Sequence, residues 1–389
     1  MRTTFLASKL VEKGHNVFWW TSAFDHFKKD WAFKKDSQLV VTEGLTIVAL
    51  KGIGYNKNIS FSRYLDHKIL ARKFRKIAPT MIKPNVIIAS SPPYDLAYEA
   101  VIFAKKENIP VLVDIRDEWP DLFLDVVSKP FRKLLRIILF RDFHMIKDAL
   151  LMSDGLIAMM NSLLEWGLKY AERPKGPNDR VFYLGAQKNI GQGLMKNHKF
   201  INAFNNKFII TFIGNFVKNN DPSILIKCAE RLLNTNIHFV LAGNGELFDK
   251  IKKMASGLSN VSLLGWLNQD EIDALLSLSH IGICPTSQFR NAFPNKAFIY
   301  LSAGLPILSA FQGDLKDIIK EYQIGFYYPP PDVDALEKCI KRLYDDQNLY
   351  KKMSSSVDMV FNELFSADKI YSEYAEHIEK VIIRHKIGI

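Results

Sequence analysis

Residues 208–246 read FIITFIGNFVKNNDPSILIKCAERLLNTNIHFVLAGNGE, and this stretch decides the fold class. Two apolar runs, Phe208–Gly214 and Ile237–Gly243, flank an amphipathic segment at Ile224–Leu233. Continuous apolar runs of this length are typical of parallel strands that are buried on both faces. A helix between two such strands makes a βαβ unit, so the stretch predicts a parallel α/β sheet.

The same alternation extends over the rest of the chain. Further strands are predicted at Asn16–Thr21, Leu45–Leu50, Val86–Ser90, Val111–Ile115, Gly155–Met159, Val181–Leu184, Val261–Leu264, Ile281–Pro285, Pro306–Ser309 and Phe326–Tyr328. Further helices are predicted at Thr3–Lys13, Ser62–Ile77, Leu96–Glu107, Phe131–Leu150, Leu163–Tyr170, Glu246–Ala255, Gln269–Leu278, Lys296–Ala303 and Leu315–Tyr322. Because the alternation runs through twice, we expect two doubly wound α/β domains, connected by the segment 172–207.

The first predicted element is a helix, at Thr3–Lys13. A doubly wound α/β domain normally opens with a strand whose loop leads into its first helix. We therefore expect the N-terminal domain to lack its first strand and the loop that follows it.

Composition narrows the class of protein. The chain has 389 residues, 48% hydrophobic and 24% charged, which is the balance of a globular protein. Its three cysteines have no short spacing, which excludes a disulfide framework or a cysteine-ligated zinc site. No apolar run reaches the length of a membrane span, and Lys9 interrupts the N-terminus too early for a secretory signal. We expect a cytoplasmic protein that is peripherally associated with the inner face of the cell membrane.

Positive charge is concentrated in the first half of the chain. Residues 1–190 carry 30 basic and 20 acidic side chains, whereas residues 191–389 carry 22 and 21. Within residues 51–83 there are nine basic side chains and one acid, Asp66. Such a segment favours an anionic membrane surface or a polyanion as partner, the alternative being a solvated helix face. We expect no nucleic-acid partner, because few aromatic residues interleave with the basic ones.

Glycine-containing turns follow three predicted strands of the second half. Gly214 and Asn215 end the first, and a glycine there lets backbone N–H groups approach a phosphate. Gly243 and Gly245 follow the second strand in a GxG turn, which by itself is weak evidence for a phosphate site. Trp266 and Leu267 follow a third strand, where backbone groups can meet a nucleobase.

A helix start at Pro294-Asn295-Lys296 is the fourth candidate element. Asn295 is predicted to cap this helix, whose N-terminal N–H groups and positive dipole end suit a pyrophosphate. Lys296 in the first turn is either an ordinary surface lysine or a cation directed at a ligand phosphate.

In the first half, Arg116 and Asp117 directly follow the strand Val111–Ile115 and are the best site candidates. The alternative is an Arg–Asp pair that braces the strand end. Ser90 and Ser91 either contact a ligand or cap the next helix. His15 and His144 are expected to be structural.

In this order, the segments resemble the GT-B glycosyltransferases, specifically the large retaining family 4. The resembling segments of the second half are FIGNF, LAGNGELFDKI, NVSLLGWLNQDEIDALLSLSHIGICPT, PNKAFIYLSAGLPIL and IGFYYPPPDVDAL. Those of the first half, GHNV, SSPPYDLA, LVDIRDEWPDLF and RVFYLG, are similar to the subgroup that builds surface polysaccharides on lipid carriers. The resemblance extends over more than 300 residues.

The resemblance implies a GT-B fold, with two Rossmann-like domains that face each other across a cleft. It implies an acceptor domain at 1–190, a nucleotide-sugar domain at 191–365, and a C-terminal helix at 366–389 that returns to the first domain. It implies a hexosyltransferase that moves a sugar, with retention, from a nucleotide-sugar to a lipid-linked saccharide in capsule, O-antigen or exopolysaccharide synthesis, without cofactor or bound metal. The implied catalytic residues are Asp117, beside the transferred sugar, and Arg116. The implied donor-binding residues are Gly214, Asn215, Lys218, Gly243, Gly245, Trp266, Leu267, Asn291, Pro294, Asn295, Lys296 and Ile299.

The chain departs from the family at two places. Gly304 and Pro306 set the register, so the two glutamates of the family signature fall on Asn291 and Ile299. Ile299 cannot accept hydrogen bonds from ribose hydroxyls, a loss of roughly 1.5–3 kcal/mol. The basic residues that the family places after Gly214 are also absent, and Lys218 and Lys296 are the candidates to replace them. These departures and the absent first strand leave an alternative, a degenerate GT-B protein that acts as a partner or scaffold.

Overall fold

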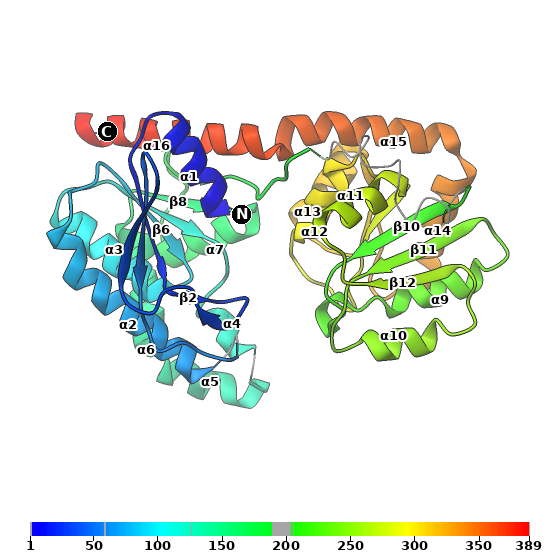
Figure 1. Cartoon of the computed structure of the whole chain (residues 1–389), viewed down its shortest axis with the longest axis horizontal. Helices are drawn as coiled ribbons and strands as arrows, with labels where there is room; N and C mark the ends of the chain where they lie inside the picture. The colour runs from blue at the N-terminus through cyan, green and yellow to red at the C-terminus, as the bar shows by residue number, and fades with distance from the viewer. Residues whose placement is uncertain (1, 58–59, 126, 189–203, 205, 389) are drawn as a thin grey trace. The chain divides into compact units, whose positions relative to one another are not determined.

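The computed structural model describes residues 2–57, 60–125, 127–188, 204 and 206–388. The chain divides into two compact units (Figure 1). Unit 1 comprises Met1–Tyr183 and Tyr371–Ile389, and unit 2 comprises Leu184–Ile370. Part of the predicted connection 172–207, namely residues 189–203 and 205, lies outside the described residues.

Unit 2 is built on a six-stranded parallel sheet of order β12-β11-β10-β13-β14-β15. Its strands are β10 (Phe208–Ile213), β11 (Ile237–Ala242), β12 (Val261–Gly265), β13 (Ile281–Cys284), β14 (Ile307–Ser309) and β15 (Gly325–Tyr327). Every residue of β11 and β13 is buried, as the continuous apolar runs predicted. The predicted parallel α/β class is confirmed, with strand ends within one or two residues of the expected positions.

Helices α9 to α13 of unit 2 lie between these strands in the chain, and α14 and α15 follow the last strand (Figure 1). They are α9 (Ser223–Arg231), α10 (Phe248–Met254), α11 (Gln269–Leu278), α12 (Asn295–Ser302), α13 (Asp314–Tyr322), α14 (Val333–Asp345) and α15 (Gln347–Val360). Polar caps define several of their starts: Asn268 accepts the Glu271 N–H at α11, and Asp332 accepts the Ala335 N–H at α14. Such caps satisfy N–H groups that would otherwise lack a partner in the first turn.

Tyr300 locks α12 onto the sheet. Its buried hydroxyl accepts a hydrogen bond from the Ile213 N–H at 2.8 Å, at the carboxyl end of β10. Its ring lies where a side chain on Gly282 of β13 would be, so a Cβ at that position would overlap the ring. The start of α12 is therefore held beside the end of β10.

Unit 1 contains two separate sheets instead of one. The first has the order β1-β5-β4 and the second the order β6-β7-β8-β9, and no pairing among the described residues joins β1 to β6. The strands are β1 (Val17–Ser22), β4 (Ser37–Thr42), β5 (Leu45–Leu50), β6 (Ile87–Ser91), β7 (Val111–Ile115), β8 (Gly155–Ala158) and β9 (Arg180–Val181), with a short hairpin of β2 (Phe24–Asp25) and β3 (Asp30–Trp31). In the doubly wound order the first strand of the domain lies at the centre, between the strands that correspond to β1 and β6.

The two sheets of unit 1 share helices. Leu70 and Phe74 of α2 (Phe61–Ile77) and Ala97 of α3 (Tyr94–Lys106) form one core with Leu50 of β5 and Ala89 of β6. The other helices are α1 (Arg2–Glu12), α4 (Asp121–Leu124), α5 (Lys129–Ile138), α6 (Phe140–Met152), α7 (Asn161–Ala171) and α16 (Ala367–Ile387). From Tyr371 onward, α16 belongs to unit 1, where His377 hydrogen-bonds the Asn178 carbonyl at 3.0 Å.

Two predicted features of unit 1 were wrong. The single helix expected at Phe131–Leu150 is two, because the chain breaks at Leu139 between α5 and α6. Only α6 buries a face against the core, so the two segments have different packing requirements. The exposed edge strand β4 was missed, although Gly44, at a φ of +83°, marks the turn that pairs it antiparallel with β5.

Gly282→Ala should lower the free energy of unfolding by about 1–3 kcal/mol, because the added methyl must displace the Tyr300 ring. Urea unfolding of the purified chain measures this change. Gly176→Ala is the matched control, since a Cβ there makes only an ordinary contact at 3.5 Å. Equal stability of the two variants would contradict this account of the α12 packing.

Candidate functional site

In unit 2 the loops at the carboxyl ends of the strands form one hydrogen-bonded rim. After β10, the Phe216 N–H donates to the Asn244 carbonyl at 2.9 Å, which ties this loop to the one after β11. The Lys218 N–H donates to Glu246 Oε1 at 3.1 Å, and Ser287, after β13, donates to the Lys218 carbonyl at 3.2 Å. Ligands of open α/β sheets bind at this edge.

Close packing of these loops explains the GxG turn. A Cβ on Gly243 would overlap the Gly214 carbonyl, and a Cβ on Gly245 would lie 2.6 Å from the Phe216 carbonyl oxygen. The Gly214 N–H donates to the Ala242 carbonyl at 3.0 Å, so this particular amide already has a partner. What Gly214 provides is space, because its missing side chain leaves room for Lys296.

Lys296 is a buried cation directed at the end of β10. The residue is 7% exposed, and its Nζ has no hydrogen-bond partner among the described residues. The ammonium lies 4.0 Å from the centre of the Phe212 ring, and a Cβ on Gly214 would be only 3.0 Å from it. Burial lowers the pKa of Lys296 to about 8, and burial raises the pKa of the neighbouring Cys284 thiol to about 12, so this thiol supplies no counter-charge.

The same helix start offers backbone donors. The N-cap of α12 is Pro294, and the prediction that Asn295 caps it is wrong, because Pro294 takes the extended backbone of a cap (φ −68°, ψ 139°) and Asn295 is the first helical residue. No side chain caps this end, which leaves first-turn N–H groups for a ligand. An uncapped N-terminus beside a buried ammonium is suited to an anion.

The other expected donor residues lie around this centre with different exposure. Trp266 is 67% exposed and follows Gly265, whose carbonyl accepts the Gly243 N–H at 2.6 Å, so its ring is accessible beside the GxG turn. Leu267 packs against a buried core cluster instead, which indicates a structural role. Three further candidates are exposed: Asn215, Lys218 and Asn291. Two are partly buried, Pro294 and Ile299. Ile299 lies one turn after Lys296 on α12.

In unit 1 the strand end after β7 is built on Asp114, which the sequence reasoning missed. This buried carboxylate accepts hydrogen bonds from Arg2 Nη2 at 2.8 Å and from Arg116 Nε at 3.2 Å. Burial alone would raise its pKa, but the two guanidinium groups outweigh that effect and hold the pKa below its usual range. The bracing role considered for Arg116 is therefore present, with Asp114 as its partner. Asp117 is exposed directly after this strand end.

The remaining candidates of unit 1 are two serine residues and two histidine residues. The Ser91 hydroxyl is buried without a partner among the described residues, and α3 starts after Pro93 with no side-chain cap, so the capping alternative is wrong. His15 hydrogen-bonds Glu379 at 2.9 Å, and His144 lies 3.0 Å from the Phe140 carbonyl, as expected for structural histidines.

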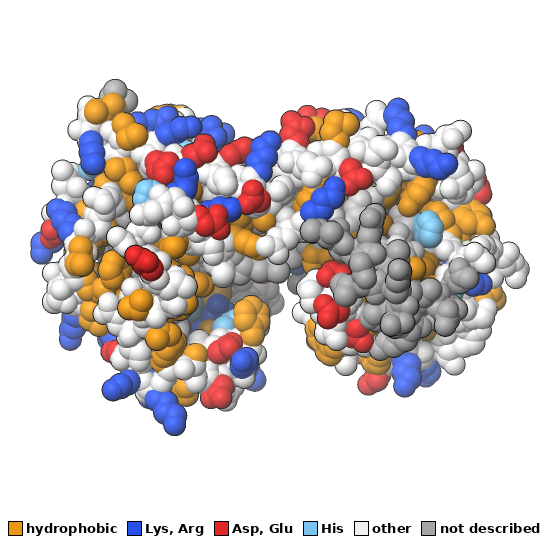
Figure 2. Space-filling view, turned by 45° about the horizontal axis from the view of Figure 1, so that its top comes forward, with side chains coloured by type: hydrophobic (Ala, Val, Ile, Leu, Met, Phe, Trp, Pro, Cys, Tyr) orange, Lys and Arg blue, Asp and Glu red, His pale blue; other side chains and the backbone are white. Residues whose placement is uncertain are grey.

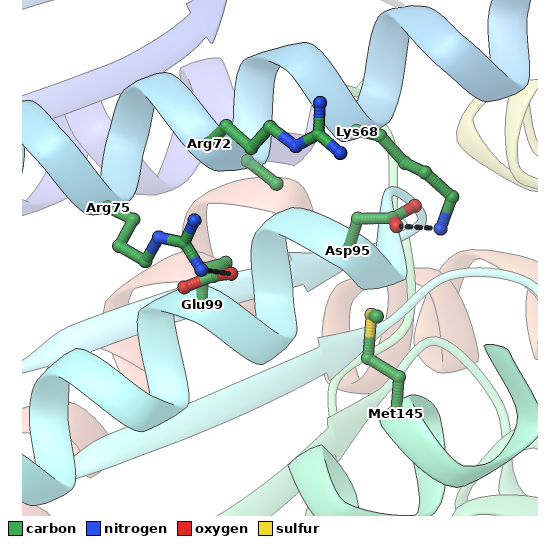
Figure 3. A pocket seen from close by; sticks show the side chains of 7 residues that line it. Lys68, Arg72, Arg75, Asp95, Glu99 and Met145 are labelled. Carbon is green, nitrogen blue, oxygen red and sulfur yellow. Dashed lines mark hydrogen bonds and ion pairs between the residues drawn. The ribbon is translucent and has the colours of Figure 1, made fainter. Parts of the chain in front are cut away.

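A pocket of about 250 Å³ lies along the basic helix α2. Figure 3 shows the side chains that line it. Lys68 reaches Asp95 at 2.9 Å and the buried Asp142 at 3.0 Å, and Arg75 reaches Glu99 at 3.3 Å. Burial alone would lower the pKa of Lys68, but its hydrogen bond and attraction to Asp95 outweigh this and raise it. The cations at this pocket thus mostly have acidic partners.

Much of the basic segment 51–83 is neutralised in the same way. Lys73 pairs with Asp36 at 2.7 Å, and Lys83 with Glu107 at 3.8 Å. Figure 2 shows Lys and Arg interspersed with acidic and apolar side chains on the visible face of unit 1. On the visible face of unit 1, the basic side chains therefore do not form a continuous positive patch.

In residues 2–57, 60–125, 127–188, 204 and 206–388, no cluster of three or more His, Cys, Asp or Glu could hold a metal ion. No helix within those ranges is long and apolar enough to cross a membrane.

The sequence of this chain is similar to those of known glycosyltransferases. Residues 195–357 match the family described as "Glycosyl transferases group 1". The chain is 26% identical over 166 residues to O-antigen chain mannosyltransferase C of Escherichia coli, covering 42% of this chain and 44% of that protein. It is 25% identical over 217 residues to a Campylobacter jejuni α-1,4-N-acetyl-D-galactosaminyltransferase named for an undecaprenol-diphosphate-linked saccharide, covering 53% and 59%. The matched stretches span about half the length of these curated relatives.

Solved structures extend the likeness to the whole chain. Sucrose-phosphate synthase of Thermosynechococcus elongatus superimposes with a TM-score of 0.70 at 15% identity, over 97% of this chain and 92% of that one. Anabaena Alr3699/HepE in complex with UDP gives a TM-score of 0.65 at 14% identity, over 86% of each chain. The predicted GT-B fold is confirmed.

Lys296→Met should remove a pH dependence of stability. The folded pKa of Lys296, about 8, is below its ordinary value of 10.5, so between these pH values the unfolded state binds more protons and stability rises with pH. At pH 7 the variant should be more stable than wild type by about 2–3 kcal/mol, a difference that shrinks towards pH 10.5. Urea unfolding from pH 7 to 10 measures this slope.

Lys227→Met, at an exposed lysine of α9, is the matched control and should keep the wild-type slope. An unchanged slope in Lys296→Met would show that this ammonium is not held in a dry environment.

Proposed function

We propose that the chain is a retaining glycosyltransferase of family 4 that transfers a sugar from a nucleotide-sugar to a lipid-linked saccharide. The observation that carries this proposal is the buried, unpartnered ammonium of Lys296 beside the uncapped start of α12. The match to the group 1 glycosyl transferases and the GT-B fold support it. The proposed pathway is surface-polysaccharide synthesis, with a hexose as the transferred sugar.

Unit 2 is proposed to bind the donor. The diphosphate accepts hydrogen bonds from Lys296 and from first-turn N–H groups of α12, while Trp266 offers an exposed ring to the base. An ammonium already in place stabilises the charge that develops on the leaving diphosphate, and no bound metal is required in this proposal. Binding of UDP by the structurally similar HepE supports a nucleoside diphosphate as ligand.

Unit 1 is proposed to bind the acceptor. Asp117 contacts the transferred sugar, and Arg116 orients the strand end through Asp114. The acceptor hydroxyl attacks on the face from which the diphosphate leaves, and its proton passes to the leaving phosphate oxygen.

The undecaprenol-linked saccharide in the name of the Campylobacter relative supports a lipid-linked acceptor. Association with the inner face of the cell membrane through the basic segment 51–83 remains part of the proposal.

A thermal-shift titration with UDP and GDP tests donor binding. A nucleotide that binds only the folded chain raises the melting temperature in proportion to RT ln(1 + [L]/Kd). Lys296→Met should weaken the affinity about ten- to a hundredfold, because it removes a charged donor to the phosphates. The exposed control Lys227→Met should bind as wild type. Absence of any shift at millimolar UDP and GDP would count against the proposed function and favour a degenerate partner or scaffold.

Ile299→Glu should strengthen nucleotide binding by about tenfold or more. The family signature places a carboxylate at this position, and a carboxylate accepts hydrogen bonds from ribose hydroxyls that isoleucine cannot accept. Calorimetric titration with UDP measures the change, and Ile299→Leu, which keeps an apolar side chain, is the control. If Ile299→Glu binds no better than Ile299→Leu, the ribose is held elsewhere.

A further inference from the structure

The helix α5 carries an apolar face that nothing in the described structure covers. The stretch 129–141 reads KPFRKLLRIILFR, with five basic side chains and no acid. No residue of α5 is buried. Five large apolar side chains in and directly after the helix are between 55% and 71% exposed: Phe131, Leu134, Ile137, Ile138 and Phe140.

The exposed apolar side chains form one stripe. Phe131, Leu134 and Ile138 recur at i, i+3 and i+7, which places them on the same face of a helix. Such a stripe normally packs on the protein core, and the charged face meets water. In α5 the stripe is on the outside.

Two basic side chains of α5 contact neighbouring parts of unit 1. Arg132 pairs with Asp125, before the helix, at 3.1 Å. The Arg136 guanidinium lies 4.8 Å from the centre of the Phe143 ring in α6. The Arg132 and Arg136 contacts thus come from basic side chains, while Phe131, Leu134 and Ile138 remain exposed.

The surroundings of the stripe identify its partner. Lys129, Lys133 and Arg141 are all exposed beside it. An apolar stripe bordered by basic residues is the pattern of helices that lie in a membrane interface, with their apolar face among acyl chains and their cations at anionic headgroups. We propose that α5 docks unit 1 onto an anionic phospholipid bilayer by inserting this stripe.

This assignment differs from the basic segment 51–83, in which several cations have acidic partners. The proposal deepens the proposed function by naming the surface through which a lipid-linked acceptor is reached. Only the biological role of this surface rests on the proposed function. Vesicle binding is measured without donor, so its failure and the failure of nucleotide binding are separate results.

The test is flotation of the full chain with vesicles of phosphatidylcholine alone, or of phosphatidylcholine in which roughly a third of the lipid is anionic phosphatidylglycerol. Anionic lipid attracts basic segments, so the two vesicle types separate the contribution of charge. Wild type should bind the anionic vesicles, less at high salt, and bind neutral vesicles more weakly. Leu134→Glu combined with Ile138→Glu should lower the partition coefficient about tenfold or more, because it puts charge into the stripe. Since both positions are exposed, the variant should keep wild-type circular dichroism and nucleotide affinity.

The matched control is Ile383→Glu combined with Ile387→Glu. These side chains are also four residues apart on a helix and are 57% and 62% exposed, but they lie on α16, at the opposite end of unit 1 from α5 (Figure 1). The control should bind vesicles as wild type. Equal loss in both variants, no loss in the α5 variant, or no vesicle binding by wild type would each overturn the proposal. It would also be overturned if the α5 variant changed only the oligomeric mass in light scattering, since the stripe would then bind a second copy of the chain.

Discussion

The hydrogen bond from the Ile213 N–H to the Tyr300 hydroxyl is the contact on which the unit 2 site depends. It joins the last residue of β10 to the middle of α12, and it requires that Gly282 carry no side chain. Lys296 lies four residues before Tyr300, on the same face of the helix, so the bond also places its ammonium beside Gly214. One buried tyrosine thus positions both the cation and the helix start.

The strands of unit 1 do not form one continuous sheet, and buried ion pairs connect several of its elements. Arg2 connects the start of α1 to Asp114 at the end of β7. Lys68 connects α2 to α3 and α6 through Asp95 and Asp142. The first pair joins a helix to a strand, and the Lys68 pairs join three helices. Removing one partner of such a pair would leave a buried charge uncompensated.

The sequence was sufficient for the strands of unit 2, because strands buried on both faces are continuous apolar runs such as Ile237–Ala242. It also located Lys296, but not its burial, which depends on Phe212 and Gly214 from another element. Partners distant in the chain, such as Arg2 and Asp114, have no local signal. The helical periodicity of α5 is visible in the sequence, but periodicity does not tell which face of the helix is covered. Charge density along the sequence therefore predicted the membrane-binding surface at residues 51–83 instead.

The contrast between Lys296 and the other buried cations supports the proposal that Lys296 binds an anionic ligand. Arg2 and Lys68 each have a buried carboxylate within 3.0 Å, as buried charges in proteins normally do. The Lys296 ammonium lies beside the Phe212 ring and near the neutral Cys284 thiol, and its Nζ has no hydrogen-bond partner among the described residues. A lysine with a purely structural role could be replaced by methionine with a gain in stability, so the cost of burying its charge requires a compensating benefit. The proposed anion at the start of α12 would supply that benefit, since by accepting hydrogen bonds from Lys296 it would favour the charged form that burial disfavours.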